Sequence, residues 1–431
     1  MKRILVLFPN EWDHAEFSEP RYRDRYEFIY EGFDLFKFPE NARLMTFNAR
    51  RFIERMIKRY AGAGLDGVLS TDEHFGTMVA AIVAERLGLP GPDPESILIA
   101  QHKYYARIRA AEVAPEANPK FSFFPFTIKS PAGVGLPFPL YVKPVKATYS
   151  ILARRVDDFA ELRRHLTFHP FERLILKRLI APFNALGAER LLFPVDAHHL
   201  VAEELMSGDQ VTIEGIVHDG RYINLGVVDS IMYPGTNAFE RFDYPSSLPE
   251  SVQTRMAELA ERLIVGFGFT HGFFNVEFFY QRETDRIMLI EVNPRMAYQF
   301  SDLREKVDGF NSYNALLAMT VGDVPKVVFG QGAYRYASSF VMRAFGQPKL
   351  LEAPPSAQVA AVQSRHQHSR IMVYIKKGAS LARELKWLGS YRYAVINLGA
   401  IDRPQLFQRY GEVAAELPFR FAEPPVLNTL S

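Results

Sequence analysis

The sequence predicts a mixed α/β and α+β protein, and two patterns along the chain support that prediction. Over residues 1–105, short apolar segments alternate with amphipathic stretches that end at glycines, which predicts an open parallel α/β domain. Between residues 200 and 293, apolar segments instead follow one another through short polar turns, which predicts an antiparallel sheet. A length of 431 residues with 48% hydrophobic content fits roughly two to four domains.

The N-terminal domain, residues 1–105, carries two strand signals and two helix signals. Strands are predicted at KRILVLF and LDGVLS, where apolar runs suit a buried sheet. One helix is predicted over 47–64, where apolar residues recur at helical spacing, and a second over 75–91, where Gly88 and Pro90 end it. Strands that alternate with helices in this way form a parallel sheet covered on its faces.

Residues 106–199 are expected to form a small α+β subdomain. A helix over 102–115 leads through a Pro- and Phe-rich connector to a strand at 140–145, and residues 154–166 carry a second helix that opens near Asp157 and Asp158. The segment 168–193 presents a broad apolar helical face. Packing within the subdomain or against a second subunit is one explanation of that face, and contact with a hydrophobic substrate tail or a membrane surface is the other.

Residues 200–330 are expected to form a larger subdomain, and residues 331–431 a small α+β tail. In the larger subdomain, a strand at 200–206 precedes a hairpin that turns at Asp219-Gly220. A surface helix over 248–268 then delivers the chain into a second hairpin. After a helix near 310–321, the tail has short strand signals and one helix over 402–416.

Two glutamates on the second hairpin are the strongest chemical signal in the chain. A hairpin centred on Thr284 places Glu277 opposite Glu291 and Asn275 opposite Asn293. Facing carboxylates repel each other unless a cation lies between them, and Asn293 projects on the same face as Glu291. This all-oxygen set predicts a Mg²⁺ site. An exposed acidic pair is the alternative, but the apolar flanks favour the metal site.

Composition bears on the class of function. The balance of 51 basic and 49 acidic residues argues against a dedicated nucleic-acid binder. The absence of cysteine excludes disulfides, thiolate metal sites and cysteine nucleophiles. The first apolar run is too short for a signal-peptide core, and no stretch is long enough to span a bilayer, so a cytoplasmic location is expected.

Four motifs, in order, carry a resemblance to a known family. They are LYVKPV (140–145), VAEELMSGDQVTIEGIVHDG (201–220), NVEFFY (275–280) and LIEVNPR (289–295). Together they resemble the ATP-grasp superfamily of carboxylate–amine ligases, and within it the L-amino-acid ligase and carbamoyl-phosphate-synthase-like branch. The resemblance implies two α+β subdomains that hold ATP, and an ADP-forming ligase that joins a carboxylate to an amine through an acyl phosphate. The implied cofactors are ATP and Mg²⁺, with Mn²⁺ as an alternative ion.

The same resemblance assigns roles to individual residues. Glu277, Glu291 and Asn293 match the metal ligands, and Arg295, just after Pro294, matches the catalytic arginine that stabilises developing negative charge. The residues that match nucleotide-binding positions are Lys103, Lys143, Ser150, Glu203, Glu204, Met206 and Gln210.

The chain departs from the family's pattern in several places, and the segment 168–193 is one of them, because it is long for the lid of this fold. His102 stands where the family usually has aspartate. The loop 145–152 reads VKATYSIL, although this loop is usually rich in glycines whose backbone N–H groups close over phosphates. Lys146 is expected to supply charge there in place of some of the backbone dipoles.

The sequence leaves the substrates and two rival functions open. Regions 231–246 and 296–309 are expected to line the pocket, with Arg241 and Arg304 as carboxylate clamps, while His271 either contacts substrate or is structural. The rival functions are another ATP-grasp enzyme, such as a carboxylase or a kinase-like phosphotransferase, and a catalytically silent ATP-binding module. The expected partners are small-molecule carboxylate and amine substrates, with no nucleic acid and no membrane span, and a homodimer is left open.

Overall fold

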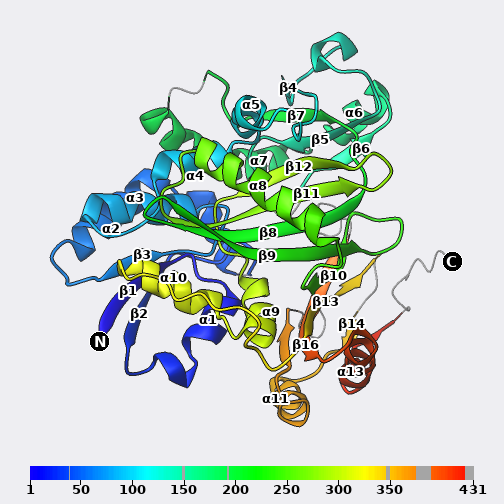
Figure 1. Cartoon of the computed structure of the whole chain (residues 1–431). Helices are drawn as coiled ribbons and strands as arrows, with labels where there is room; N and C mark the ends of the chain where they lie inside the picture. Colours follow the sequence, from blue (N-terminus) through cyan, green and yellow to red (C-terminus); the bar gives the residue numbers. More distant parts are fainter. Residues whose placement is uncertain (38, 148–150, 192–193, 346–349, 375–389, 423–431) are drawn as a thin grey trace.

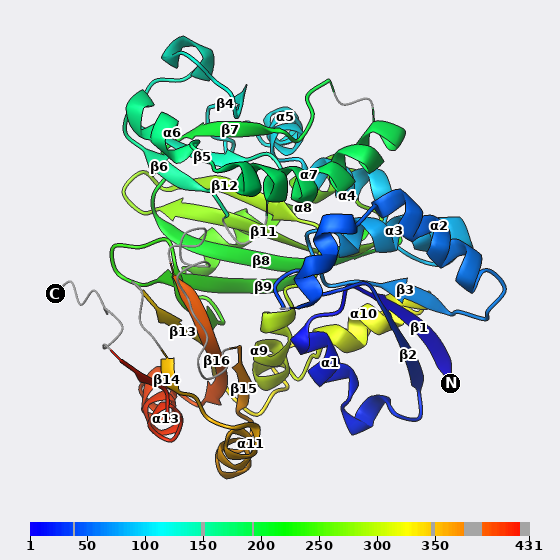
Figure 2. The ribbon, with the colours of Figure 1, turned by 180° about the vertical axis from the view of Figure 1, so that it is seen from behind.

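The computed structural model describes residues 1–37, 39–147, 151–191, 194–345, 350–374 and 390–422. Its main sheets lie in three regions (Figure 1): a parallel sheet near the N-terminus, a four-stranded sheet in a small lobe, and an eight-stranded sheet through the centre. The small lobe lies above the central sheet in both opposite views (Figure 2). The predicted α/β and α+β fold class is therefore confirmed.

The N-terminal sheet is parallel, as the alternating pattern predicts. Its strands are β1 (Lys2–Leu7), β2 (Tyr26–Glu31) and β3 (Gly67–Leu69), in the order β2-β1-β3. Because the strands are parallel, the carboxyl ends of β1 and β3 meet at one edge, where ligand-binding loops of α/β sheets usually lie. The helices of this region are α1 (Glu11–Phe17), α2 (Ala49–Tyr60), α3 (Gly76–Leu87) and α4 (Pro94–Gln101).

The small lobe contains two strands that the sequence did not indicate. Its antiparallel sheet has the order β4-β7-β5-β6, with β4 (Phe121–Pro125), β5 (Leu140–Pro144), β6 (Arg154–Val156) and β7 (His199–Glu204). β4 lies inside the Pro- and Phe-rich connector. β6 lies just before the helix predicted to begin near Asp157 and Asp158. Asp158 accepts a hydrogen bond from the backbone N–H of Glu161 at 2.7 Å, so α6 (Phe159–His165) begins where the sequence predicts.

The apolar segment 168–193 forms α7 (Pro170–Arg190), which packs against α2 of the N-terminal region. Ile180, Phe183 and Leu186 are buried in a core shared with that region. The packing partner is therefore a neighbouring region of the same chain, which the sequence did not identify.

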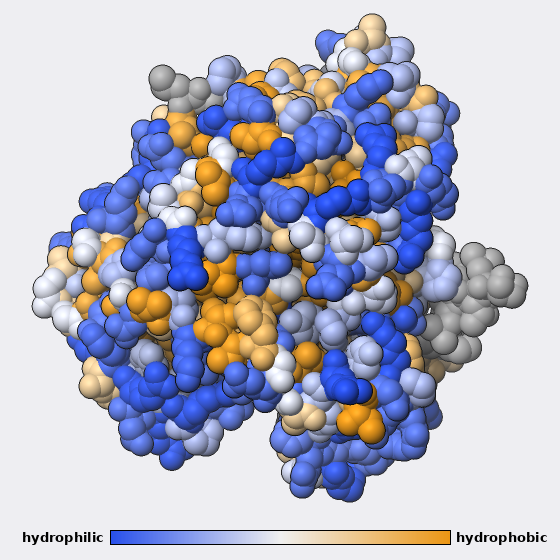
Figure 3. All heavy atoms as spheres, viewed as in Figure 1, coloured by the Kyte–Doolittle hydropathy of each residue, from blue (hydrophilic) through white to orange (hydrophobic). Residues whose placement is uncertain are grey.

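Figure 3 shows a surface covered mainly by hydrophilic residues, with apolar residues in smaller patches. Within the described ranges, no helix is long and apolar enough to cross a bilayer.

The central sheet has the order β12-β11-β8-β9-β10-β13-β16-β15, and its neighbouring strands are antiparallel. Strands from the C-terminal part of the chain extend the sheet that carries the two glutamates. The strands are β8 (Asp209–His218), β9 (Arg221–Met232), β10 (Phe239–Tyr244), β11 (Gly272–Gln281), β12 (Arg286–Asn293), β13 (Tyr336–Ala344), β15 (Arg370–Val373) and β16 (Tyr391–Ala400). A short separate pair is formed by β14 (Leu350–Glu352) and β17 (Arg420–Phe421).

Helices pack on this sheet and connect it to the other regions. α8 (Glu250–Gly266) packs on β8, β9 and β11, and α5 (Lys103–Val113) packs on β12 and on α8. The remaining helices of the sheet region are α9 (Tyr298–Asp308), α10 (Ser312–Thr320), α11 (Ser356–Arg365) and α13 (Arg403–Ala415).

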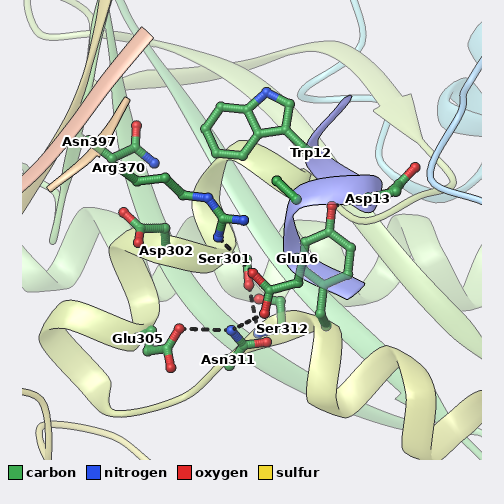
Figure 4. A network of polar contacts seen from close by, with 12 residues as sticks. Trp12, Asp13, Glu16, Ser301, Asp302, Glu305, Asn311, Ser312, Arg370 and Asn397 are labelled. Atoms are coloured by element: carbon green, nitrogen blue, oxygen red, sulfur yellow. Dashed lines mark hydrogen bonds and ion pairs between the residues drawn. The ribbon is translucent and has the colours of Figure 1, made fainter. Parts of the chain in front are cut away.

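A buried network of hydrogen bonds connects the N-terminal region to the C-terminal strands (Figure 4). Glu16 on α1 accepts hydrogen bonds from Arg370 Nη1 at 2.6 Å and from Asn311 Nδ2 at 3.1 Å. The guanidinium of Arg370 also lies 5.4 Å from the ring centre of Trp12. Because Glu16 is fully buried, it needs these partners, and the network fixes the N-terminal sheet against the central one.

Candidate active site

The two glutamates of the second hairpin face each other, as the sequence predicts. Glu277 pairs with Glu291 and Asn275 pairs with Asn293 across β11 and β12. At the turn, the pairing differs by one residue from a hairpin centred on Thr284, because Gln281 pairs with Arg286 and not with Ile287. A bulge just after Glu277 then shifts the register by one residue and brings the glutamates opposite each other.

Two side-chain amides donate hydrogen bonds to Glu277. Asn293 Nδ2 donates to Glu277 Oε1 at 3.1 Å and to Asn275 Oδ1 at 2.9 Å. Gln210 Nε2, from the adjacent strand β8, donates to Glu277 Oε2 at 3.1 Å. The structure therefore places Gln210 beside the predicted metal ligands. A cation between Glu277 and Asn293 requires the Asn293 amide to present its oxygen instead of its nitrogen.

Two predicted phosphate lysines reach this hairpin from the small lobe side. Lys103 Nζ, at the start of α5, lies 3.1 Å from Glu291 Oε2. Lys143 Nζ, on β5, lies 3.0 Å from Glu203 Oε1 and donates to the Ile290 carbonyl at 3.2 Å. Lys103 and Lys143 are thus brought to the same edge of β12 from elements far apart in the sequence.

The alternation of β7 separates the two adjacent glutamates. Glu203 points inward, is fully buried, and accepts a hydrogen bond from Arg107 Nε at 2.7 Å. Glu204 points to the other face and accepts one from the Lys120 backbone N–H at 2.9 Å. Met206 lies in the loop from β7 to β8 and is half-buried. Ser150 lies outside the described residues.

The facing glutamates have opposite pKa shifts. Burial and the neighbouring Glu291 raise the pKa of Glu277 above the usual range of a carboxyl group. Burial acts in the same sense on Glu291, but Lys103 and Lys143 outweigh it and lower the pKa of Glu291. The lysines therefore compensate the charge of one carboxylate, while the ionised form of the other stays unfavourable.

Arg295 meets a glutamate from the N-terminal region. Its Nη2 lies 2.5 Å from Glu73 Oε2, and its Nε donates to the same oxygen at 2.8 Å. Glu73 follows β3, at the edge of the parallel sheet where ligand-binding loops gather. Glu73 was not identified from the sequence, although its position just after a predicted strand, in TDEH, was the available signal.

Lys146, the substitute charge expected in the glycine-poor loop, is almost fully buried beside this pair. Its Nζ donates to Gln101 Oε1 at 2.9 Å and to the Glu73 carbonyl at 3.2 Å. Burial lowers the pKa of Lys146 to about 7, and the positive charge of Lys103 acts in the same sense. An anion bound next to Lys146 would favour its charged form.

The residues present fit a hard divalent cation. Two carboxylates and an amide oxygen are the donor types that Mg²⁺ takes, usually with water or phosphate oxygens completing its shell. Burial and the neighbouring Glu291 raise the pKa of Glu277, so the ionised form of this carboxylate would be favoured by an additional cation beside it. A divalent ion between the strands would be such a cation, so the donor set and the electrostatics agree.

Three other predicted residues lie elsewhere. Arg304 is fully buried and pairs with buried Glu214 at 3.0 Å, so its predicted role as a carboxylate clamp is wrong. Arg241 contacts Asp243 at 3.2 Å on β10, and its role stays a prediction. His271 precedes β11 at the end away from Glu277, which favours the structural alternative.

Three solved structures align with nearly the whole chain. L-amino acid ligase from Bacillus licheniformis aligns with 98% of this chain and 99% of its own, at a TM-score of 0.72 and 16% identity. Carboxyaminoimidazole ribonucleotide synthase from Aspergillus clavatus, solved with ATP, aligns with 96% of this chain and 98% of its own, at a TM-score of 0.67 and 15% identity. Phosphoribosylglycinamide synthetase from Anaerococcus prevotii aligns with 97% of this chain and 99% of its own, at a TM-score of 0.64 and 12% identity.

In sequence, the chain is 28% identical over 264 residues to a Sinorhizobium fredii protein named y4rH, over 60% of this chain and 49% of that protein. The chain thus spans about half the length of the curated relative it matches. No family model matches the chain.

These alignments define the fold of the chain. At 12–16% identity they show the fold alone, and the chain has the ATP-grasp fold. Besides the ligase, the synthase and the synthetase named above, the structural matches include a biotin carboxylase from Campylobacter jejuni. One fold thus supports several reactions here, so the reaction of this chain has to be argued from its site.

Proposed function

We propose that this protein is an ADP-forming, magnesium-dependent ligase that joins a carboxylate to an amine. The observation that carries the proposal is the meeting of Glu277, Glu291 and Asn293 with Lys103 and Arg295 at one edge of the central sheet. Structures with this fold hold ATP in one case and magnesium ADP in another. A set of acids flanked by cations suits phosphoryl transfer, in which positioning and charge stabilisation supply most of the catalysis.

Each residue has a separate task in the proposed reaction. Glu277, Glu291 and Asn293 would hold Mg²⁺, whose chemistry is to neutralise the charge of the phosphate oxygens. Lys103 and Lys143 would bind the outer phosphate oxygens, exchanging their present carboxylate partners for the nucleotide.

The two chemical steps balance without any further reactant. A substrate carboxylate oxygen attacks the γ-phosphorus of ATP in line, forms an acyl phosphate and releases ADP. An amine then attacks the acyl carbon, the bond from that carbon to the phosphate oxygen breaks, and inorganic phosphate leaves as the amine loses a proton. Arg295, held by Glu73, would donate to the oxygen that gains charge during this second step, because its fork offers several N–H groups.

The test is phosphate release measured with amino acids and other carboxylates, singly and in pairs. Ligation predicts that release rises when a carboxylate and an amine are present together, and that mass spectrometry finds the condensed product. Release that needs a single carboxylate and yields a stable phosphorylated product would contradict ligation and indicate a phosphotransferase. ATP binding without turnover under every condition would indicate a silent module.

A further inference from the structure

The other end of the ladder between β8 and β11 brings two histidines and an aspartate together. Val217 pairs with Gly272, so one further step of this register places His218 across from His271. Their ring centres lie 5.3 Å apart. Asp219 follows at the turn into β9, and one potential ligand atom of each of the three residues lies within 4.8 Å of the others.

The His271 ring has one nitrogen in a hydrogen bond and the other available to bind a ligand. Its Nε2 lies 3.2 Å from the Met319 carbonyl at the C-terminal end of α10. A carbonyl only accepts hydrogen bonds, so Nε2 carries the proton and Nδ1 keeps its lone pair. Metal-binding histidines usually donate their other N–H to a carbonyl or carboxylate in this way, which fixes the tautomer and the orientation of the ring.

His218 carries the second indication of a ligand. Its Nδ1 is buried and has no hydrogen-bond partner among the described residues. Its Nε2 is 3.6 Å from Asp219 Oδ2, which is too long for a hydrogen bond. The His218 side chain is 12% exposed and that of Asp219 is 85% exposed. The group is thus enclosed on one side and open to solvent on the other.

We propose that His218, His271 and Asp219 bind a divalent transition-metal ion of the zinc class, with water as a further ligand. Two imidazole nitrogens and one carboxylate oxygen form a donor set that suits Zn²⁺ and Co²⁺, whereas Mg²⁺ prefers oxygen alone. Tetrahedral zinc holds such ligand atoms about 3.3 Å apart. The exposed side chain of Asp219 is free to rotate inward and close the set.

This site is separate from the proposed catalytic one. His271 precedes Glu277 by six positions in the sequence, which is about 20 Å of extended chain. The ion would join the turn between β8 and β9 to the start of β11 and, through His271, to the end of α10. Its role is therefore structural, to hold these segments together. The site does not depend on whether the protein is a ligase.

Cobalt titration of the chelator-treated full chain tests the site. Four-coordinate Co²⁺ absorbs visible light, so binding of one equivalent per chain should give a saturable band that Zn²⁺ removes and millimolar Mg²⁺ does not. His271→Gln and His218→Gln should each weaken Co²⁺ binding about tenfold or more. His366→Gln is the control, because that histidine contacts Glu416 at 2.8 Å in the C-terminal region and should leave binding unchanged.

Asp219→Asn is a second variant that preserves the turn, because asparagine tolerates the positive φ of 50° found at this position. It should weaken Co²⁺ binding while the circular dichroism spectrum stays that of the wild type. The absence of a saturable band in the wild type would overturn the proposal. So would equal Co²⁺ affinity in the wild type, Asp219→Asn and His271→Gln.

Discussion

Arg295 and Glu73 are 222 residues apart in the sequence and make the closest contact of the proposed catalytic site. We expect Arg295→Ala to lower kcat by about 10²- to 10³-fold, the usual effect of removing a donor that stabilises transition-state charge. Nucleotide affinity should change little. Phosphate release and fluorescent-nucleotide titration measure the two effects.

Arg282→Ala is the matched control for this change. Arg282 lies on the same hairpin but is exposed and pairs with Asp209, so its loss should leave kcat within the wild-type range. Normal turnover in Arg295→Ala would show that the arginine has no catalytic role.

The facing glutamates should respond differently to the same substitution. Without metal at pH 8, Glu277→Gln removes a carboxylate whose raised pKa makes its ionised form unfavourable, so stability should rise by about 1–2 kcal/mol. Glu291→Gln removes the partner of Lys103 and should lower stability. Thermal unfolding with and without Mg²⁺ measures both effects.

Both substitutions should also raise the magnesium concentration needed for activity about tenfold or more. Glu283→Gln, at an exposed position in the turn of this hairpin, is the control. Unchanged magnesium dependence in both variants would rule out the proposed ligand set.

At the scale of elements, α5 is anchored to the central sheet by one buried arginine. Arg107 Nη1 and Nη2 donate to the Leu289 and Ile290 carbonyls at 2.9 and 2.7 Å, and Nε donates to Glu203. Glu203 thus forms ion pairs with both Arg107 and Lys143. This arrangement joins α5, β5, β7 and β12 and explains why Lys103, at the start of α5, lies over Glu291.

Arg107→Met should destabilise the protein by about 3–5 kcal/mol, because it leaves a buried carboxylate with one cationic partner fewer. Arg109→Met is the matched control on the same helix, at an exposed position paired with Glu112. Urea unfolding measures both variants. If the two variants unfold at the same denaturant concentration, Arg107 does not anchor α5 to the sheet.

At the scale of the whole molecule, two buried histidines link its regions and make its stability depend on pH. His74 Nε2 donates to the Leu179 carbonyl of α7, and His102 Nε2 donates to the Val195 carbonyl, each at 3.1 Å. Burial lowers the pKa of His74 to about 3 and that of His102 to about 4. Both histidines therefore stay neutral in the folded protein, whereas in the unfolded chain they take up protons below about pH 6.5.

The sign of the effect follows from this difference. Stability falls as the pH drops below about 6.5, and each histidine contributes a loss of about 2 kcal/mol between pH 7 and pH 5. His74→Gln keeps a donor for Leu179 and should remove one such contribution. Denaturant unfolding at the two pH values measures the difference, with exposed His368→Gln as the control. Equal pH dependence in these two variants would contradict the assignment to His74.

The fold class, most elements and the facing glutamates could be predicted from the sequence alone. These features rest on local patterns: strand alternation places Glu291 and Asn293 on one face, and a hairpin brings neighbouring segments together. Even there, the register depended on a bulge that compensates for a turn shorter than predicted. Residues 231–246, expected only to line a pocket, supply strand β10.

Which distant residues meet was set by the tertiary structure. Glu73 joins Arg295, Arg107 joins Glu203, and α7 packs on α2, all through contacts between segments that no spacing in the sequence connects. It also placed Arg304 in a buried ion pair away from the predicted pocket. The physical reason is that periodicity reports which face of an element is buried, whereas the partner of that face is set by packing of the whole chain.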